Sequence, residues 1–183
     1  PVPRLGCSIP LLVAPVTLFA SLLLFALLLS YHHGDVRNFS VIGHRFLTQS
    51  QSSPAIQLGP IANSTMDELG YDGQFAYYIA LDPINARYYL DNPPYRYTRI
   101  LYPLLARLLA LGRPEAVALT LVLVNLLAAV GGSAAVAAWC QLRGQSPWLA
   151  LVYSLSMGQM LAFARDLTEV LAHAPVALAI STF

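Results

Sequence analysis

The chain has 183 residues, of which 57% are hydrophobic and only 10% are charged. Soluble domains carry about 25% charged residues, so too few charges remain here to cover a water-facing surface. The composition therefore indicates a membrane protein, because lipid can cover an apolar exterior. The net charge is +1, which excludes the strong positive field that is typical of nucleic-acid-binding proteins, and we expect no nucleic-acid partner.

Four apolar runs predict membrane-spanning helices. About 20 apolar residues, each adding about 1.5 Å, are needed to cross a bilayer, and the first run has no charge between Arg4 and Asp35. The predicted spans cover about residues 9–31, 115–141, 148–164 and 170–183. We therefore expect an all-α fold, a polytopic transmembrane helical bundle.

The two ends of the chain suggest that it is part of a longer protein. It begins at Pro1 without a methionine and stops at Phe183 inside an apolar run, so we expect residues 1–183 to form a single, incomplete transmembrane domain. A cleaved signal peptide is the competing interpretation of residues 1–31. It fits less well, because the apolar run is long and no small-x-small cleavage site follows it.

A long polar loop, residues 32–114, separates the first two spans. Within it, Gly70–Leu81 is predicted to be a helix that Asp72 caps and that ends at Asp82 and Pro83. Its apolar residues at helical spacing would lie on one face, in the membrane interface where tyrosine is favoured. These residues are Tyr71, Phe75, Tyr78 and Ile79.

A second amphipathic helix is predicted over Ile100–Leu111. Leucines at helical spacing form one apolar stripe, which Arg99 and Arg107 flank. The segment is too short to span, so we expect this helix to lie along the membrane surface as well.

The orientation follows from the arginines in the short loops. Arg4 and Arg143 lie on the same side if the spans alternate, and positive residues favour the cytoplasm. We therefore expect a cytoplasmic N-terminus, with Cys7 and Cys140 on that side and residues 32–114 outside. The two cysteines have no metal-ligand spacing and no disulfide framework.

The candidate chemistry begins in the first loop helix. Asp72 is a carboxylate at a helix start, next to a glycine that leaves space and among aromatic residues. Such a carboxylate can accept a proton from a hydroxyl group; alternatively, it only caps its helix.

Further on, Arg96 and Arg99 lie among tyrosines, and guanidinium groups bind phosphate well. The alternative is that they only anchor the segment to anionic headgroups.

A third candidate segment, Arg165–Glu169, separates two apolar runs. Ionisable residues at a membrane edge are candidates for function. Arg165 and Glu169 are four residues apart, so a local ion pair is the alternative explanation. His173, inside the last run, receives no role.

The stretch Tyr71–Ala80 resembles the aromatic-Asp-Gly-x-aromatic element in the first external loop of GT-C superfamily glycosyltransferases. It looks most like bacterial mannosyltransferase-like membrane proteins and the GPI-mannosyltransferase-like group. The segment Arg165–Leu171 is similar to a Thr/Ser-Glu element near a later span of those proteins. The resemblance covers about residues 66–112 and 157–172.

The resemblance implies a membrane enzyme that moves a hexose, with inversion, from a polyprenyl-phosphate donor to an acceptor hydroxyl at the external face. Asp72 would be the general base, and Glu169 would shape the site or contact the acceptor. Arg96 and Arg99 are assigned to the phosphate from their charge and position. Substrate contacts are also expected from Tyr71, Gln74 and Arg165.

Some relatives carry a second aspartate where this chain has Gln74, so we expect no metal, and no cofactor is implied. The expected partners are the polyprenyl-phosphate sugar donor and membrane lipid, while the sugar and the acceptor stay open. The expected location is the bacterial inner membrane.

Two other function classes stay open. A transporter or flippase subunit would pass its substrate by Arg165, Asp166 and His173, and it predicts inverted repeats and broken helices, neither of which the sequence shows. A non-catalytic scaffold gives no reason for Asp72 to meet the arginines.

The enzyme hypothesis predicts that Asp72 and Arg96 or Arg99 line one cleft. It predicts no direct ion pair between them, because such a pair would lower the basicity of the carboxylate.

Overall fold

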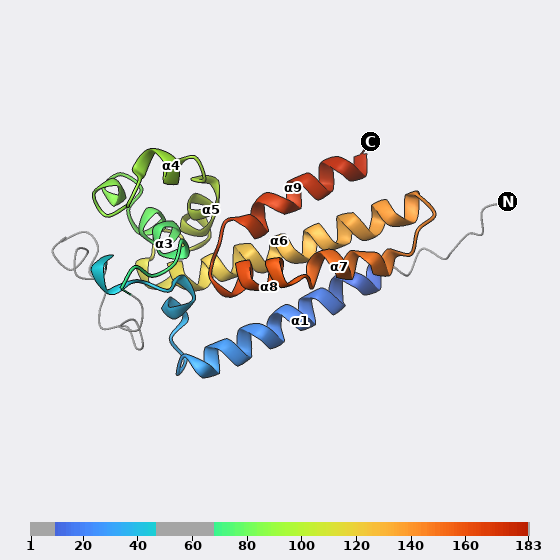
Figure 1. Ribbon diagram of the computed structural model, residues 1–183, viewed down its shortest axis with the longest axis horizontal. Coiled ribbons are helices and arrows are strands. Elements are labelled where there is room, and N and C mark those ends of the chain that lie inside the picture. Colours follow the sequence, from blue (N-terminus) through green and yellow to red (C-terminus); the bar gives the residue numbers. More distant parts are fainter. Residues whose placement is uncertain (1–9, 47–67, 183) are drawn as a thin grey trace.

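A computed structural model describes residues 10–46 and 68–182, and these residues form an all-helical fold without strands. The long helices α1 (Pro10–Tyr31), α6 (Pro114–Leu142) and α9 (Glu169–Thr182) lie alongside one another, as Figure 1 shows. With them lie a short 3₁₀ turn, η4 (Pro147–Leu149), and helices α7 (Ala150–Ser154) and α8 (Met157–Ala164). We call these helices the helical bundle.

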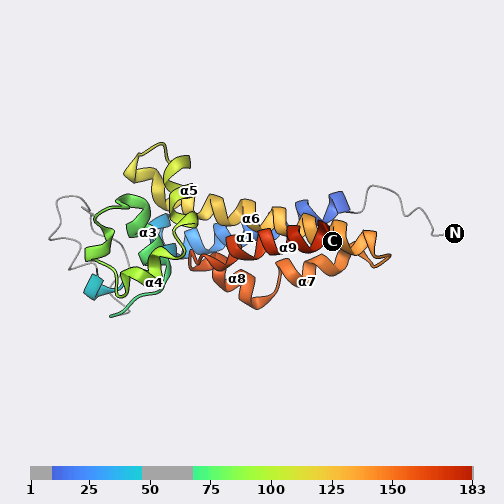
Figure 2. The ribbon, with the colours of Figure 1, turned by 90° about the horizontal axis from the view of Figure 1, so that it is seen from above.

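The short helices gather at one end of this bundle, an arrangement that Figure 2 shows from above. We call this part, the described residues from 36 to 113, the loop lobe. Its elements are η1 (Val36–Ser40), α3 (Gly73–Leu81), η3 (Ala86–Tyr88), α4 (Pro93–Tyr97) and α5 (Leu101–Leu109). The start of α6 belongs to both parts, because Val117 and Leu121 lie in the same buried cluster as the aromatic residues of α3.

Two helices are long and apolar enough to cross a membrane, Leu12–Tyr31 and Pro114–Leu142. A third crossing exists if the bent pair Pro147–Ser154 and Met157–Ala164 counts as one span. The predicted spans at 9–31 and 115–141 therefore correspond to α1 and α6. The apolar helix α9 is shorter, 14 residues in length.

The span predicted over 148–164 is not one straight helix. Helices α7 and α8 meet at a bend of 49°. The side chain of Ser156 explains the break, because it accepts a hydrogen bond from the backbone N–H of Gln159 and so starts a new helix. The sequence had shown no broken helix, and the structure has one.

Helix α3 begins at Gly73, and its surroundings differ from the prediction. Every residue from Gly73 to Ala80 is buried, so α3 has no face left for lipid and is not an interfacial helix. It is enclosed by α5, α6 and η1. A side chain of α5 also covers its C-terminal end, where Arg107 donates hydrogen bonds to the carbonyl groups of Ala80 and Leu81.

Helix α5 does expose an apolar stripe, as predicted. Tyr102 and Ala106 face the interior, whereas Leu101 and Leu108 are 60% and 69% exposed. An exposed leucine stripe of this kind suits a helix that lies against lipid.

Candidate functional site

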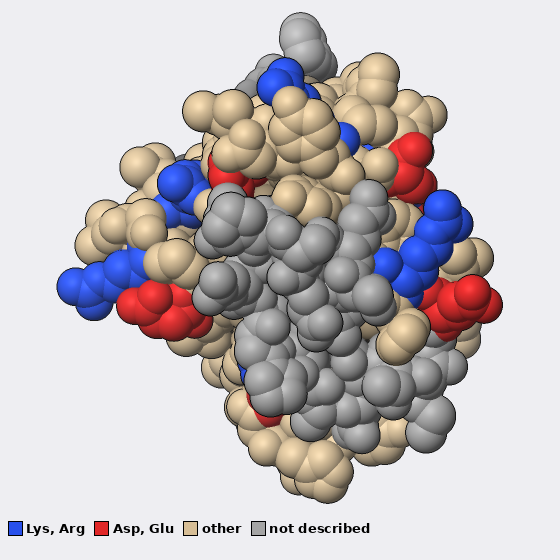
Figure 3. Space-filling view, turned by 90° about the vertical axis from the view of Figure 1, so that its left-hand side faces the viewer, with Lys and Arg blue, Asp and Glu red and all other residues tan. Residues whose placement is uncertain are grey.

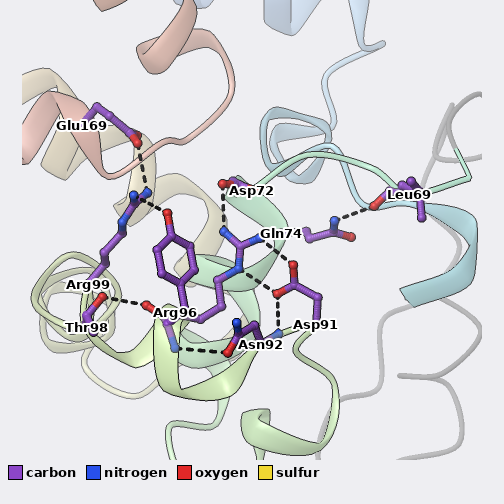
Figure 4. A network of polar contacts seen from close by, with 10 residues as sticks. Leu69, Asp72, Gln74, Asp91, Asn92, Arg96, Thr98, Arg99 and Glu169 are labelled. Atoms are coloured by element: carbon purple, nitrogen blue, oxygen red, sulfur yellow. Dashed lines mark hydrogen bonds and ion pairs between the residues drawn. The ribbon is translucent and has the colours of Figure 1, made fainter.

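Asp72 does not cap its helix. It has helical backbone angles, and its side chain makes no capping hydrogen bond. Its carboxylate instead pairs with Arg96, with 2.8 Å between Oδ2 and Nη1 (Figure 4). The structure therefore brings Asp72 and Arg96 together, as predicted, but the predicted absence of a direct ion pair is wrong. Burial of the arginine explains the contact, since its side chain is only 11% exposed and needs an anion beside it.

Arg96 has a second anionic partner, Asp91, which the sequence did not predict. The guanidinium donates to both oxygens of this carboxylate, from Nε at 2.8 Å and from Nη2 at 2.7 Å. The hydrogen bond to Asp91 raises the pKa of Arg96 above its usual value, and the same bond lowers the pKa of Asp91. The guanidinium also stacks over the ring of Phe75, 4.2 Å from its centroid. Arg96 is therefore held mainly by Asp91 and Phe75, while Asp72 occupies its remaining nitrogen.

Arg99 and Glu169 form the second ion pair of the site. Nη1 of Arg99 lies 3.0 Å from Oε1 of Glu169, and Nη2 donates to the hydroxyl group of Tyr95. Glu169 begins helix α9, so this pair joins the loop lobe to the bundle. The predicted alternative of a local ion pair between Arg165 and Glu169 is wrong, because Glu169 turns to Arg99 and its other oxygen, Oε2, is buried without a hydrogen bond from the described residues.

A small pocket lies where these two ion pairs meet. Its polar lining residues are Asp72, Arg96, Arg99, Thr168 and Glu169. Phe75, Ile79 and Pro103 contribute apolar walls. Its cavity volume of about 20 Å³ is room for roughly one water molecule. A sugar or phosphate therefore fits only if the side chains around the pocket move apart.

An apolar groove continues from this pocket along α9. It has a cavity volume of about 320 Å³ and shares Arg99, Thr168 and Glu169 with the pocket. Its further lining includes Leu171 and Pro175 of α9. The site thus combines charged groups at one end of the bundle with an apolar path beside them. Figure 3 views this end of the molecule and shows positive and negative side chains next to one another on its flanks.

Gly73 explains how the Arg165–Glu169 segment comes so close to Asp72. A side-chain carbon at this position would overlap the backbone carbonyl of Arg165 and lie 3.3 Å from the side chain of Asp166. The space beside the glycine that the sequence suggested is therefore filled by another backbone segment and is not open to a ligand.

The other predicted site residues take different positions. Arg165 stacks on the ring of Tyr71, 5.2 Å from its centroid. Gln74 is buried, and its amide donates to the carbonyl of Leu69 at 2.7 Å and accepts from the N–H of Gly43 at 3.1 Å. Gln74 therefore ties two segments of the loop lobe together and does not line the pocket.

A buried polar cluster lies between the loop lobe and the bundle. Asp166 is fully buried, accepts a hydrogen bond from the Ser40 hydroxyl at 3.2 Å and lies 3.5 Å from the Tyr102 hydroxyl. The amide of Asn125, in α6, donates to the same tyrosine at 2.9 Å. Burial raises the pKa of Asp166 to about 8, so its carboxyl group is neutral near pH 7. The sequence pointed to Asp166 as an ionisable residue of the Arg165–Glu169 segment, and no local signal points to Asn125 or Ser40.

Among the residues that the structure describes, no group of three or more histidine, cysteine or acidic side chains is arranged to hold a metal ion. Cys140 is buried and its thiol is free, whereas Cys7 lies outside the described residues. The polar groups that line the pocket are the carboxylates of Asp72 and Glu169, the guanidinium groups of Arg96 and Arg99, and Thr168.

Comparisons with known proteins give no relative from which a function can be transferred. No protein-family model, curated protein or solved structure matches this chain. Its function is accordingly inferred from the geometry of the site.

Proposed function

We propose that this chain is part of a membrane glycosyltransferase that moves a sugar from a polyprenyl-phosphate donor to an acceptor hydroxyl. The observation that carries the proposal is the convergence of Asp72, Arg96, Arg99 and Glu169 on one pocket. These residues come from three separate segments of the chain, and the pocket opens beside an apolar groove. A lipid-phosphate donor has matching parts, since it carries an anionic phosphate and a long apolar tail.

In the proposed reaction, Asp72 removes the proton of the acceptor hydroxyl. The acceptor oxygen then attacks the anomeric carbon as the bond between that carbon and the phosphate oxygen breaks. Polyprenyl phosphate leaves with the electron pair of this bond, and the configuration of the sugar inverts. Arg99 stabilises the charge that develops on the phosphate, while the polyprenyl chain lies in the groove beside Leu171 and Pro175.

The two ion pairs would have to open for this reaction, because each closes part of the pocket. The phosphate replaces Glu169 as the partner of Arg99, and the acceptor hydroxyl replaces Nη1 of Arg96 at Asp72. Arg96 can stay in place while this happens, since Asp91 holds it through its other two nitrogens. Freed from the arginine, the carboxylate of Asp72 becomes a stronger base.

A transfer assay with Asp72→Asn tests the proposal. The assay uses the full-length protein in membranes with a polyprenyl-phosphate sugar donor. The variant keeps the size of the side chain, and Asp72 caps nothing, so the protein should insert and fold. Loss of a general base should lower transfer by about a hundredfold or more. Glu115→Gln is the control, because it removes an exposed carboxylate that does not line the pocket, and it should leave transfer unchanged. Equal transfer by wild type and a well-expressed Asp72→Asn protein would exclude the catalytic role.

One observation favours a second candidate, a transporter or flippase subunit. The bend between α7 and α8 is a break within an apolar segment, and such breaks form substrate sites in transporters. Uptake or lipid flipping by reconstituted protein that does not change in Asp72→Asn would support this candidate over the enzyme.

A further inference from the structure

The break between α7 and α8 brings polar groups into an otherwise apolar part of the bundle. The hydroxyl group of Ser156 is fully used there, since it donates to the carbonyl of Tyr153 at 3.1 Å and accepts from the N–H of Gln159 at 3.4 Å. The side chains of Tyr153 and Gln159 form no such hydrogen bonds to the backbone. They lie next to each other on two sides of the break.

An open cavity of about 650 Å³ adjoins this break, and Val152 and Val176 at its rim are 72% and 56% exposed. Helices α6, α7, α8 and α9 all contribute to it, and its walls include Val136, Val152, Tyr153, Gln159, His173 and Val176. Binding sites for small molecules have volumes of about 300–1,000 Å³ and mostly apolar walls with a few polar groups. The cavity shares no lining residue with the pocket at Asp72 or with the groove beside it.

Gln159 supplies an unpartnered polar group at this cavity. The residue is only 5% exposed, and neither its amide nitrogen nor its amide oxygen has a hydrogen bond from the described residues; the same holds for the hydroxyl of Tyr153. Even a bond between these two side chains would leave either the amide N–H₂ or the amide oxygen without a partner. Buried polar groups are nearly always satisfied, so an additional molecule with hydrogen-bonding groups is expected here.

Gly132 makes room for this arrangement. It lies in α6 opposite Tyr153, and a side-chain carbon at its position would be 2.6 Å from the tyrosine hydroxyl. The tyrosine ring therefore fits against the backbone of α6, which keeps its hydroxyl group beside Gln159.

We propose that this cavity binds one uncharged amphiphile that carries a hydroxyl group on a long apolar chain. The hydroxyl group both donates and accepts, so it can pair with Gln159 and Tyr153 together. The apolar chain lies against the three valines of the wall. A charged headgroup is disfavoured, because no arginine, aspartate or glutamate lines the cavity. This site is separate from the proposed transferase site and does not depend on it.

Photolabelling tests the proposal. The probe is hexadecanol bearing a diazirine group, added to the full chain in lipid nanodiscs, and labelled residues are mapped by mass spectrometry. We expect label on α7, α8 and α9 near Tyr153 and His173. Unlabelled hexadecanol should compete about tenfold better than hexadecane, because one additional hydrogen bond raises affinity by roughly that factor. Hexadecanoate, which is charged, should compete less than hexadecanol.

Two variants and one control complete the experiment. Gln159→Leu and Tyr153→Phe each remove a polar partner with little change of size, and each should weaken hexadecanol competition about tenfold without changing that of hexadecane. Gln145→Leu makes the same chemical change at an exposed position in a turn and should have no effect. The proposal is overturned if the wild type is not labelled at the cavity, as when water or another helix fills it, or if hexadecane competes as well as hexadecanol. Labelling does not depend on Asp72, so a failure here leaves the transferase proposal untouched.

Discussion

Nη1 of Arg96 lies 2.8 Å from a carboxylate oxygen of Asp72. The same guanidinium contacts Asp91 through its other two nitrogens, so one nearly buried cation holds two carboxylates that are about half exposed. This relationship connects α4 to the start of α3. Asp72 is therefore already paired in this structure, and the pair would have to open in the proposed reaction.

Arg96 is therefore expected to contribute to stability as well as to the site. Replacing it in Arg96→Gln leaves two carboxylates close together without a cation, and it should lower the free energy of unfolding by about 1–3 kcal/mol. Thermal unfolding of the purified protein in detergent measures the change. Arg113→Gln is the control, because Arg113 is exposed and forms no ion pair within the described part of the chain. A similar loss in both variants would contradict the structural role of Arg96.

Gly73 should tolerate no side chain. The added methyl group of Gly73→Ala would overlap the carbonyl of Arg165, so the two segments must separate, at a cost of about 1–3 kcal/mol. Gly131→Ala is the matched control, since nothing lies within 4 Å of the carbon that it adds in the middle of α6. Alanine should stabilise that helix by up to about 1 kcal/mol. Unfolding temperatures of the two variants should therefore move in opposite directions, and a shift of the same sign would refute the close packing at Gly73.

Asp166 predicts a specific dependence of stability on pH. Its pKa is raised to about 8 in the folded protein, whereas an aspartate in an unfolded chain has a pKa of about 3.9. Between these two values the folded state holds a proton that the unfolded state has lost. The contribution of Asp166 to stability should therefore be fully present below about pH 4 and be lost as the pH rises towards about 8.

The variant Asp166→Asn isolates this effect, because it is neutral at every pH and keeps both polar atoms of the side chain. Unfolding temperatures measured from pH 5 to pH 9 should decline more steeply in the wild type, and the variant should be the more stable protein at the alkaline end. Parallel curves for the two proteins would show that Asp166 does not carry a proton when folded.

Topology can be tested at two exposed positions. Cys140 is buried, so its failure to react would not report its side of the membrane, and a cysteine-free background is needed. In that background we introduce Ile84→Cys in the loop lobe and Leu142→Cys at the end of α6, positions that are 73% and 77% exposed. A membrane-impermeant maleimide on intact cells should label the first and reach the second only after permeabilisation. Labelling of both in intact cells would mean that α6 does not cross the membrane.

The sequence alone was enough to predict the helical class, the positions of α1 and α6, and two of the short helices of the loop lobe, α3 and α5, but not α4. Composition and runs of apolar residues are local properties, so they carry this information directly. The motif around Asp72 likewise pointed to the segment that now lines the pocket. The surroundings of these elements were harder to predict, because α3 has an apolar pattern that suits lipid and the interior of a lobe equally well.

Only the tertiary structure decided which charges meet. Asp72 pairs with Arg96 instead of capping its helix, and Glu169 pairs with Arg99 instead of the nearby Arg165. The first outcome depends on how close α4 comes to α3, and the second on how close α9 comes to the segment between α4 and α5. The break at Ser156 follows the same rule, since one serine side chain can start a new helix only where the packing around it accepts the bend. Charge pairing and burial are set by distances between segments remote in sequence, and a one-dimensional pattern does not contain those distances.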